Sequence, residues 1–175
     1  MTTHRELVAW SAAYCGRAAE AFGFEVDLSR VEWEVSTRAK RRAAAVKRPA
    51  VEDATVGTPR SWNGRVPTCT VSLTWAAFES FSRTEWTATL RHELVHVEQF
   101  QRFGTTDHGD RFERRASAVD APVRVRRFAD AAYVLSCTDC GQVVARRYRD
   151  CKLVRGHETY ASSCCSAPLA LDERT

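Results

Sequence analysis

The segment that decides the fold is His92-Glu93-Leu94-Val95-His96, which lies inside a longer helical pattern. Ser82 and Glu85 form a capping box at the start of this pattern, and Gly104 is placed to end it, so we predict a helix to about Phe103. Residues four apart share one face of a helix, so both histidine rings can point at one metal ion. The glutamate between them is placed to exchange a proton with water that the metal activates. The segment therefore predicts a helix that carries a hydrolytic metal centre.

A third protein ligand would complete a zinc site that keeps one position open. Gln99 and Arg102 stand where a metzincin would have glycine and histidine, which excludes that class. His108 is the favoured third ligand, because Gly104 allows the chain to reverse after the helix and return an imidazole to the site. The alternative is a carboxylate from the next helix, Glu113.

Hydrophobic patterns place the other elements of the N-terminal part. Helical spacing predicts helices over residues 3–22, 75–81 and 110–119, and alternation predicts strands over residues 31–35 and 68–73. The basic segment 38–47 is expected to supply the turn and second strand of a hairpin with the strand at 31–35. Together these elements predict an α+β fold in which helices pack on a small, mainly antiparallel sheet.

The seven cysteines divide into two groups. Cys15 and Cys69 stand alone in apolar surroundings and are expected to be core residues, whereas the other five lie between residues 137 and 165. Cys137-Thr-Asp-Cys140-Gly141 has the spacing of a zinc knuckle, and cysteines in a cytosolic chain indicate metal rather than disulfides. We therefore predict a first domain over residues 1–130 and a β zinc ribbon over 131–175, with strands at 143–149 and 153–160.

The charge of the chain is concentrated in its middle. The net charge is +4, but residues 35–127 carry 17 basic against 10 acidic residues, and 23 of the 26 basic residues are arginine, which suits phosphate contacts. The basic residues fall in three runs: Arg38, Lys40, Arg41, Arg42, Lys47 and Arg48; Arg114, Arg115, Arg124, Arg126 and Arg127; and Arg146, Arg147 and Arg149. We predict DNA binding without sequence specificity, because no motif here reads bases.

The N-terminus and the hydropathy predict a compartment. No run approaches the roughly 18 to 20 apolar residues of a membrane span, and no apolar segment of a signal peptide follows the charged N-terminus. We therefore expect a cytoplasmic protein with no membrane partner.

HELVH at residues 92–96, followed after eleven residues by H-G-x-x-F at 108–112, resembles the SprT-like zinc metallopeptidases, the family that includes Spartan. The resemblance extends over about residues 3–169. It implies a zincin-like domain with a catalytic zinc ion and one acid/base group; the implied residues are His92, His96 and His108 for zinc and Glu93 for acid/base catalysis. It also implies a DNA-associated protease, as in some relatives that act on proteins crosslinked to DNA. Association with the nucleoid is therefore a further expectation for a cytoplasmic protein of this kind. The rival is a non-catalytic, zinc-containing nucleic-acid-binding protein.

The C-terminal segment resembles the family's ribbon ending, Y-x-C-x-x-C-G-G-x-L, with one departure. Ser162 stands where that pattern has a cysteine ligand. The ligands expected for a second, structural zinc ion are Cys137, Cys140 and Cys165. For the fourth position Cys164 is favoured over Cys151, and His157 is a weaker alternative.

Overall fold

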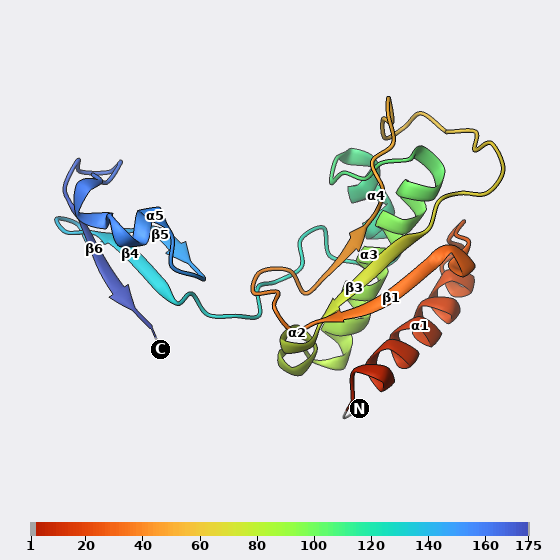
Figure 1. The fold of residues 1–175 in the computed structure, drawn as a ribbon, viewed down its shortest axis with the longest axis horizontal. Coiled ribbons are helices and arrows are strands. Elements are labelled where there is room, and N and C mark those ends of the chain that lie inside the picture. The colour runs from red at the N-terminus through yellow and green to blue at the C-terminus, as the bar shows by residue number, and fades with distance from the viewer. Residues whose placement is uncertain (1–2, 175) are drawn as a thin grey trace. The chain divides into compact units, whose positions relative to one another are not determined.

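The computed structural model describes residues 3–174. The chain divides into two compact units, with the boundary between residues 128 and 129. Each unit contains a three-stranded sheet, and the first unit adds the long helices (Figure 1). The chain is thus an α+β protein. Within the described residues, none of the helices has the length and apolar character needed to cross a membrane.

The first unit begins with helix α1, His4–Ala21, and leads through a short 3-10 helix, Leu28–Arg30, into strand β1, Val31–Ser36. Thr3 and Glu6 form the capping box of α1. Leu7 and Cys15 are buried on the inner side of α1 and belong to the hydrophobic core of this unit. The predicted helix and strand are confirmed here.

The sheet of the first unit has the order β1-β3-β2, with β2 at Ala44–Lys47 and β3 at Cys69–Thr74. Strand β1 runs parallel to β3, and β2 runs antiparallel to β3. The predicted hairpin between residues 31–35 and 38–47 is therefore wrong, and the sheet is mixed rather than mainly antiparallel. The reason is that residues 37–43 contain no glycine or asparagine for a tight hairpin turn, so the chain makes a wider loop and joins the far side of β3.

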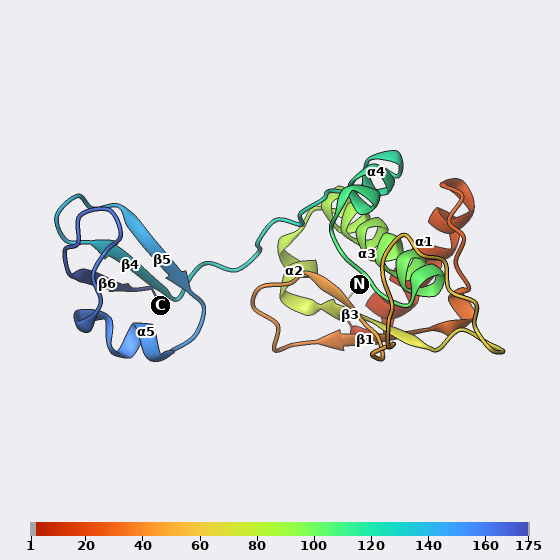
Figure 2. The ribbon, with the colours of Figure 1, turned by 90° about the horizontal axis from the view of Figure 1, so that it is seen from above.

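Three helices complete the first unit: α2, Trp75–Ser80; α3, Arg83–Phe103; and α4, Asp110–Ala118. Ser82 and Glu85 form the capping box of α3, and Gly104 ends it in the left-handed conformation at φ 78°, as predicted. Figures 1 and 2 show α1 and α3 on the same face of the sheet. Leu90, Leu94 and Val97 bury the inner side of α3, which fixes the rotation of this helix.

The second unit is an antiparallel sheet in the order β5-β4-β6, formed by Tyr133–Cys137, Val143–Arg147 and Leu169–Glu173 as β4, β5 and β6. The predicted strand at 153–160 is wrong, because this segment forms the short helix α5, Lys152–Arg155, and a 3-10 turn, His157–Thr159. Gly156 separates these two turns, and Val154 packs from α5 into a small core with Leu135 and Leu169. The third strand is instead β6.

Candidate metal centres

His92 and His96 lie on the face of α3 that borders a cleft, and both are buried within it. Because the capping box and the packed inner side fix the helix, the two rings have little freedom to turn away. Their ring centroids are 4.8 Å apart. The helix therefore presents two imidazoles to one point, as the spacing predicts.

His108 reaches the same point from the loop between α3 and α4. The left-handed Gly104 reverses the chain, and α4 begins two residues after the histidine. His108 Nε2 lies 3.1 Å from His96 Nε2 and 3.3 Å from His92 Nε2. The structure thus brings together the three predicted histidines. Glu113, the alternative, lies on the exposed side of α4 and outside this group.

The geometry of the three nitrogens fits a tetrahedral zinc ion. Zn–N bonds of about 2.0–2.1 Å place neighbouring ligand nitrogens about 3.3–3.4 Å apart, close to the separations seen here. His92 Nδ1 lies 2.7 Å from the Pro122 carbonyl, which can only accept, so Nδ1 carries the proton and Nε2 has a free lone pair. In zinc sites, a carbonyl that accepts from the other ring nitrogen orients a histidine ligand in the same way.

Burial keeps the histidines neutral. It lowers the pKa of His92, and it lowers the pKa of His96 to about 3 together with the two neighbouring imidazoles. The pKa of His108 is also lowered, mainly by burial. Neutral imidazole is the form that binds a metal ion, so the site is prepared for one at neutral pH.

Phe112 forms a wall against which all three histidines pack. Its ring centroid lies 4.8, 4.5 and 4.6 Å from those of His92, His96 and His108. The side chain is fully buried, so it joins the first turn of α4 to the core. The ring therefore limits the orientations that each imidazole can take.

Glu93 points a buried carboxylate toward the cleft. Its Oε2 is the one buried side-chain oxygen or nitrogen within residues 3–174 that has no hydrogen-bond partner. Burial raises the pKa of Glu93 to about 8, against the opposing effects of the Val46 N–H and the Arg42 charge. A buried acceptor without a partner is costly, which indicates that a ligand or water completes this site.

A cleft of about 560 Å³ runs past the histidines and Glu93. Strand β2 forms one side of it through residues 43–46. The Thr74 N–H donates to the Ala43 carbonyl over 2.9 Å, so by antiparallel alternation the peptide groups of Ala44 and Val46 point away from β3. In the described chain no other strand pairs with this edge of β2. The cleft thus contains an open strand edge beside the three histidines.

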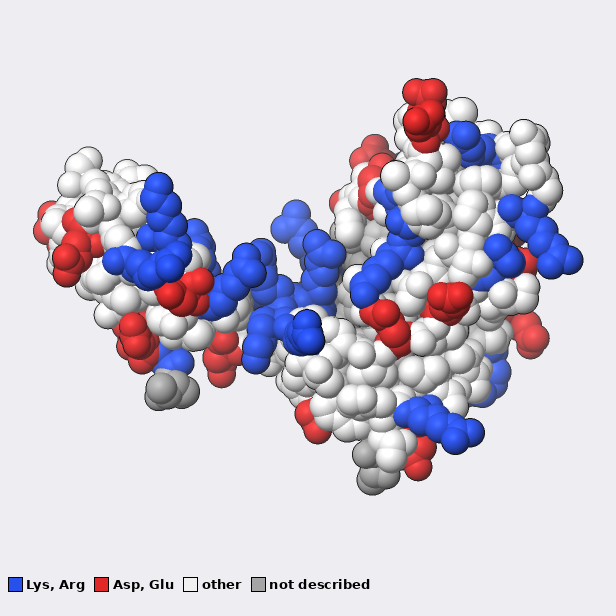
Figure 3. All heavy atoms as spheres, viewed as in Figure 1, with Lys and Arg blue, Asp and Glu red and all other residues white. Residues whose placement is uncertain are grey.

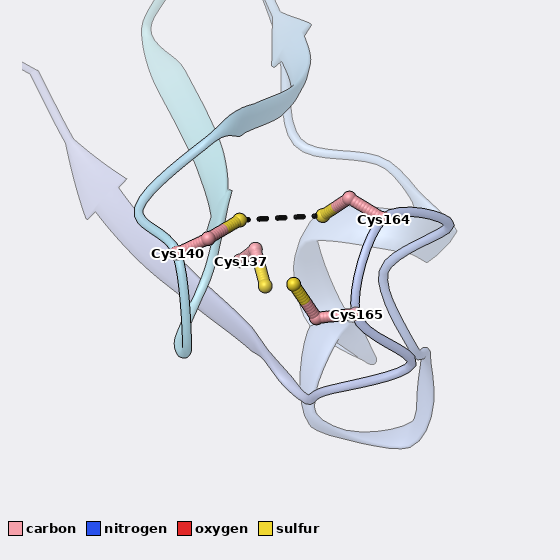
Figure 4. Close-up of side chains that lie close together, drawn as sticks. All are labelled: Cys137, Cys140, Cys164 and Cys165. Carbon is pink, nitrogen blue, oxygen red and sulfur yellow. Dashed lines mark hydrogen bonds between the residues drawn. The ribbon is translucent and has the colours of Figure 1, made fainter.

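The second unit contains a group of four thiols from Cys137, Cys140, Cys164 and Cys165. Their Sγ atoms all lie within 4.8 Å of one another, and the four side chains point toward a common centre (Figure 4). The Cys140 and Cys164 sulfurs are 3.5 Å apart, close to the roughly 3.8 Å edge of a tetrahedral zinc–thiolate site. Cys164, not Cys151 or His157, is the fourth member, so the adjacent Cys164 and Cys165 both face the centre.

Ser162 occupies the position where the ribbon pattern has a cysteine, and it lies directly behind the thiols. Its buried hydroxyl donates to Cys137 Sγ over 3.2 Å and accepts from the N–H groups of Cys165 and Ala167. The Ser162 hydroxyl is the largest contribution that lowers the pKa of Cys137, to about 6. The serine is therefore placed to stabilise a Cys137 thiolate and lies outside the group of four candidate metal ligands.

The basic runs divide between structural and open positions. Three basic residues form ion pairs within the first unit: Lys47 with Glu34, Arg115 with Glu98, and Arg126 with Glu85. These side chains therefore stabilise the fold. Arg41, Arg42 and Arg124 line the cleft instead, and Arg41 and Arg124 form no ion pair with a described residue. Figure 3 shows basic side chains gathered over the segment between β1 and β2 and over the segment that follows α4. Of the first run, Arg41 and Arg42 thus lie in the loop that borders the cleft, whereas Lys47 lies in strand β2.

A capped helix with two histidines and a glutamate, joined by a histidine from the following loop, defines a candidate metal centre of the kind found in metal-dependent hydrolases. The SprT-like family model matches residues 12–131, and the chain belongs to this family. No curated protein matches the chain. The matched region contains the three histidines and ends before the four cysteines.

The sequence does not predict the contacts that four residues make around the two sites: Pro122, Gln99, Val46 and Ser162. The carbonyl of Pro122 and the N–H of Val46 are backbone groups, so their residue types carry no signal for the contacts that they make. Gln99 carried a signal, because it lies three residues after a metal-ligand candidate on the same helix face.

Proposed function

We propose that this chain is a zinc-dependent metalloendopeptidase that hydrolyses peptide bonds in DNA-associated proteins. The observation that carries the proposal is the convergence of three neutral imidazoles beside a buried glutamate with an unpaired oxygen. Membership of the SprT-like family, whose members are generally metallopeptidase-like, supports it.

The donor set indicates how the residues would act. His92, His96 and His108 would hold a zinc ion through Nε2, and this ion would supply Lewis-acid activation of water and of the peptide carbonyl. With a cation bound nearby, Glu93 would be held in its ionised form, and it would then take the proton from the attacking water at Oε2 and return it to the leaving amine.

The open edge of β2 supports a peptide as the substrate. An extended chain can add to a strand edge through its backbone, and the outward N–H and carbonyl of Ala44 and the carbonyl of Val46 offer such bonds, while the Val46 N–H bonds Glu93 itself. Recognition through backbone groups depends little on the substrate side chains. We therefore expect cleavage of extended, unfolded segments with broad sequence tolerance.

The positive rim of the cleft supports DNA association. Arg41, Arg42 and Arg124 border the site, and the second unit carries further basic residues on β5. Cations that contact phosphates release counterions, so binding is expected to weaken steeply as salt increases and to depend little on sequence. A protein held on DNA would then be brought close to the cleft.

A cleavage assay separates this proposal from the rival, a non-catalytic zinc-containing DNA-binding protein. The full chain would be incubated with a protein covalently attached to DNA and with the same protein alone, each with and without a chelator. We expect cleavage of the attached protein, loss with chelator and recovery on adding zinc. A chain that binds zinc and DNA but cleaves neither substrate would support the rival.

A further inference from the structure

The amide of Gln99 connects two of the candidate zinc ligands. This buried side chain lies on α3, three residues after His96, and every polar atom of its amide faces a partner. Its Oε1 accepts from the Asp107 N–H at 3.3 Å and lies 3.3 Å from His96 Nδ1, while its Nε2 donates to Asp107 Oδ1 over 3.1 Å. The amide therefore bonds helix and loop at once.

The orientation of this amide is determined by Asp107. An exchanged amide would place the NH₂ group of Gln99 against the Asp107 N–H and its oxygen against the Asp107 carboxylate, so that two donors and two acceptors would oppose each other. The oxygen must therefore face His96. Because an amide oxygen only accepts, His96 must carry its proton on Nδ1.

This tautomer determines which nitrogen of His96 has a free lone pair facing the cleft. With the proton on Nδ1, the lone pair lies on Nε2, the atom that is 3.1 Å from His108 Nε2. The Asp107 carboxylate also accepts from the Gly109 N–H over 3.2 Å. Hydrogen bonds therefore restrain Asp107 and Gly109, the residues before and after His108. One pair of side chains thus sets the tautomer of a helix ligand and the place of the loop ligand.

We infer that Gln99 and Asp107 are a positioning pair that prepares the three-histidine site for its metal ion before the metal arrives. The inference rests on the proposed function for its zinc readout but not for its tautomer readout. Neither residue contacts the metal position itself. Their role is to hold His96 and His108 in the geometry that the ion requires.

The first test replaces the amide. Gln99→Ala is compared in the full chain with Gln101→Ala, a control that also removes a glutamine from α3 and breaks two bonds, to the backbone of Asp27. Nitrogen NMR of the metal-free protein reports the His96 tautomer, and zinc titration followed on the histidine signals reports affinity at this site alone.

We expect wild type and Gln101→Ala to show the Nδ1–H form of His96, and Gln99→Ala to show mixed tautomers with zinc affinity lower by about 10- to 100-fold. The inference is overturned if Gln99→Ala matches Gln101→Ala in both readouts. If the histidines of wild type show the Nδ1–H form but bind no zinc, the pair stands and the proposed function fails.

A second test keeps the inference falsifiable if Gln99→Ala does not fold. Gln99→Glu retains oxygens for His96 and the Asp107 N–H but sets two carboxylates against each other, so zinc affinity should fall. Adding Asp107→Asn supplies an NH₂ donor to the new carboxylate and should raise the affinity above that of Gln99→Glu. An Asp107→Asn change that lowers affinity equally in both backgrounds would show that the two side chains act independently.

Discussion

At the scale of single residues, the structure favours His108 over Glu113 as the third metal ligand, although both residues fitted the sequence. Its Nε2 faces those of His92 and His96, whereas Glu113 is exposed on α4. We predict that His108→Ala lowers bound zinc from roughly two ions per chain to roughly one, because two imidazoles alone hold zinc weakly. Metal analysis after dialysis measures this. Glu113→Ala is the control, and loss of zinc in that variant instead would reverse the assignment.

Ser162 allows a similar test in the second unit. Its hydroxyl donates to the Cys137 thiolate and accepts two backbone N–H groups, so Ser162→Ala leaves both N–H groups without this acceptor. We predict that zinc affinity at the cysteines falls by about 10- to 100-fold. Competition with a chromophoric chelator measures it, and the exposed neighbour Ser163→Ala should bind as wild type does. Equal affinity in both variants would contradict a role for the buried hydroxyl.

At the scale of elements, the ends of α3 determine how the histidines are presented. The Ser82 hydroxyl accepts from the Glu85 N–H, and the Glu85 carboxylate returns a bond and pairs with Arg126. We predict that Ser82→Ala lowers the free energy of unfolding by about 1 kcal/mol, measured by denaturant titration. The exposed Ser117→Ala on α4 should change it little, and an equal loss in both would argue against the cap.

The same cap has a pH dependence. Arg126, with the Ser82 backbone and hydroxyl, holds the pKa of Glu85 down at about 2, below its ordinary value of 4.5. A depressed carboxyl pKa stabilises the fold above the ordinary value, and this contribution is lost as pH falls toward 2. The stability difference between wild type and Glu85→Gln should therefore shrink between about pH 4.5 and 2.

Elements with local signals were predictable from the sequence, and those set by distant pairing were not. Capping boxes, a terminal glycine and regular hydrophobic spacing located α1 and α3. The position of β2 beside β3 depends on which strand the basic segment meets after its loop, and alternation in a single segment carries no such information. The segment 153–160 was misassigned because a few apolar residues beside Gly156 fit a strand and a helical turn equally well.

In the candidate sites, too, features with a local sequence signal were predictable, and features that depend on distant parts of the chain were not. Ligand residues were predictable because metal chemistry restricts them to a few residue types at fixed spacings. The preference for Cys164 over Cys151 is confirmed, although the packing that brings Cys164 to the knuckle depends on how the chain returns after α5. The hydrogen bonds to the ligand side chains were not predictable either. The partner of His92 is a backbone carbonyl, and the partner of Cys137 is a serine, a residue type with many other roles.

At the scale of the whole molecule, the two units place their metal ligands separately. The three histidines lie in the first unit and the four cysteines in the second, whose hydrophobic cluster is centred on buried Leu135, Val154 and Leu169. We expect a core of this size to depend on a metal ion for stability. We predict that Cys137→Ser unfolds the second unit and removes its zinc while the histidine site keeps its ion.

Metal analysis together with NMR of the full-length variant checks this separation. Signals of the first unit, including the histidine rings, should keep their wild-type positions, while those of residues 129–175 collapse to the range of an unfolded chain. Loss of both zinc ions from Cys137→Ser would mean that the units do not bind metal independently.

The proposed function depends on acid/base chemistry by Glu93 next to a zinc ion held by the three histidines. The most direct test compares Glu93→Gln with Glu79→Gln, an exposed glutamate on α2, for cleavage of a DNA-attached protein at equal zinc content. We predict that Glu93→Gln retains its zinc and its fold but loses at least about 100-fold in cleavage rate, whereas Glu79→Gln cleaves as wild type does. Cleavage by zinc-loaded Glu93→Gln at the wild-type rate would contradict the account.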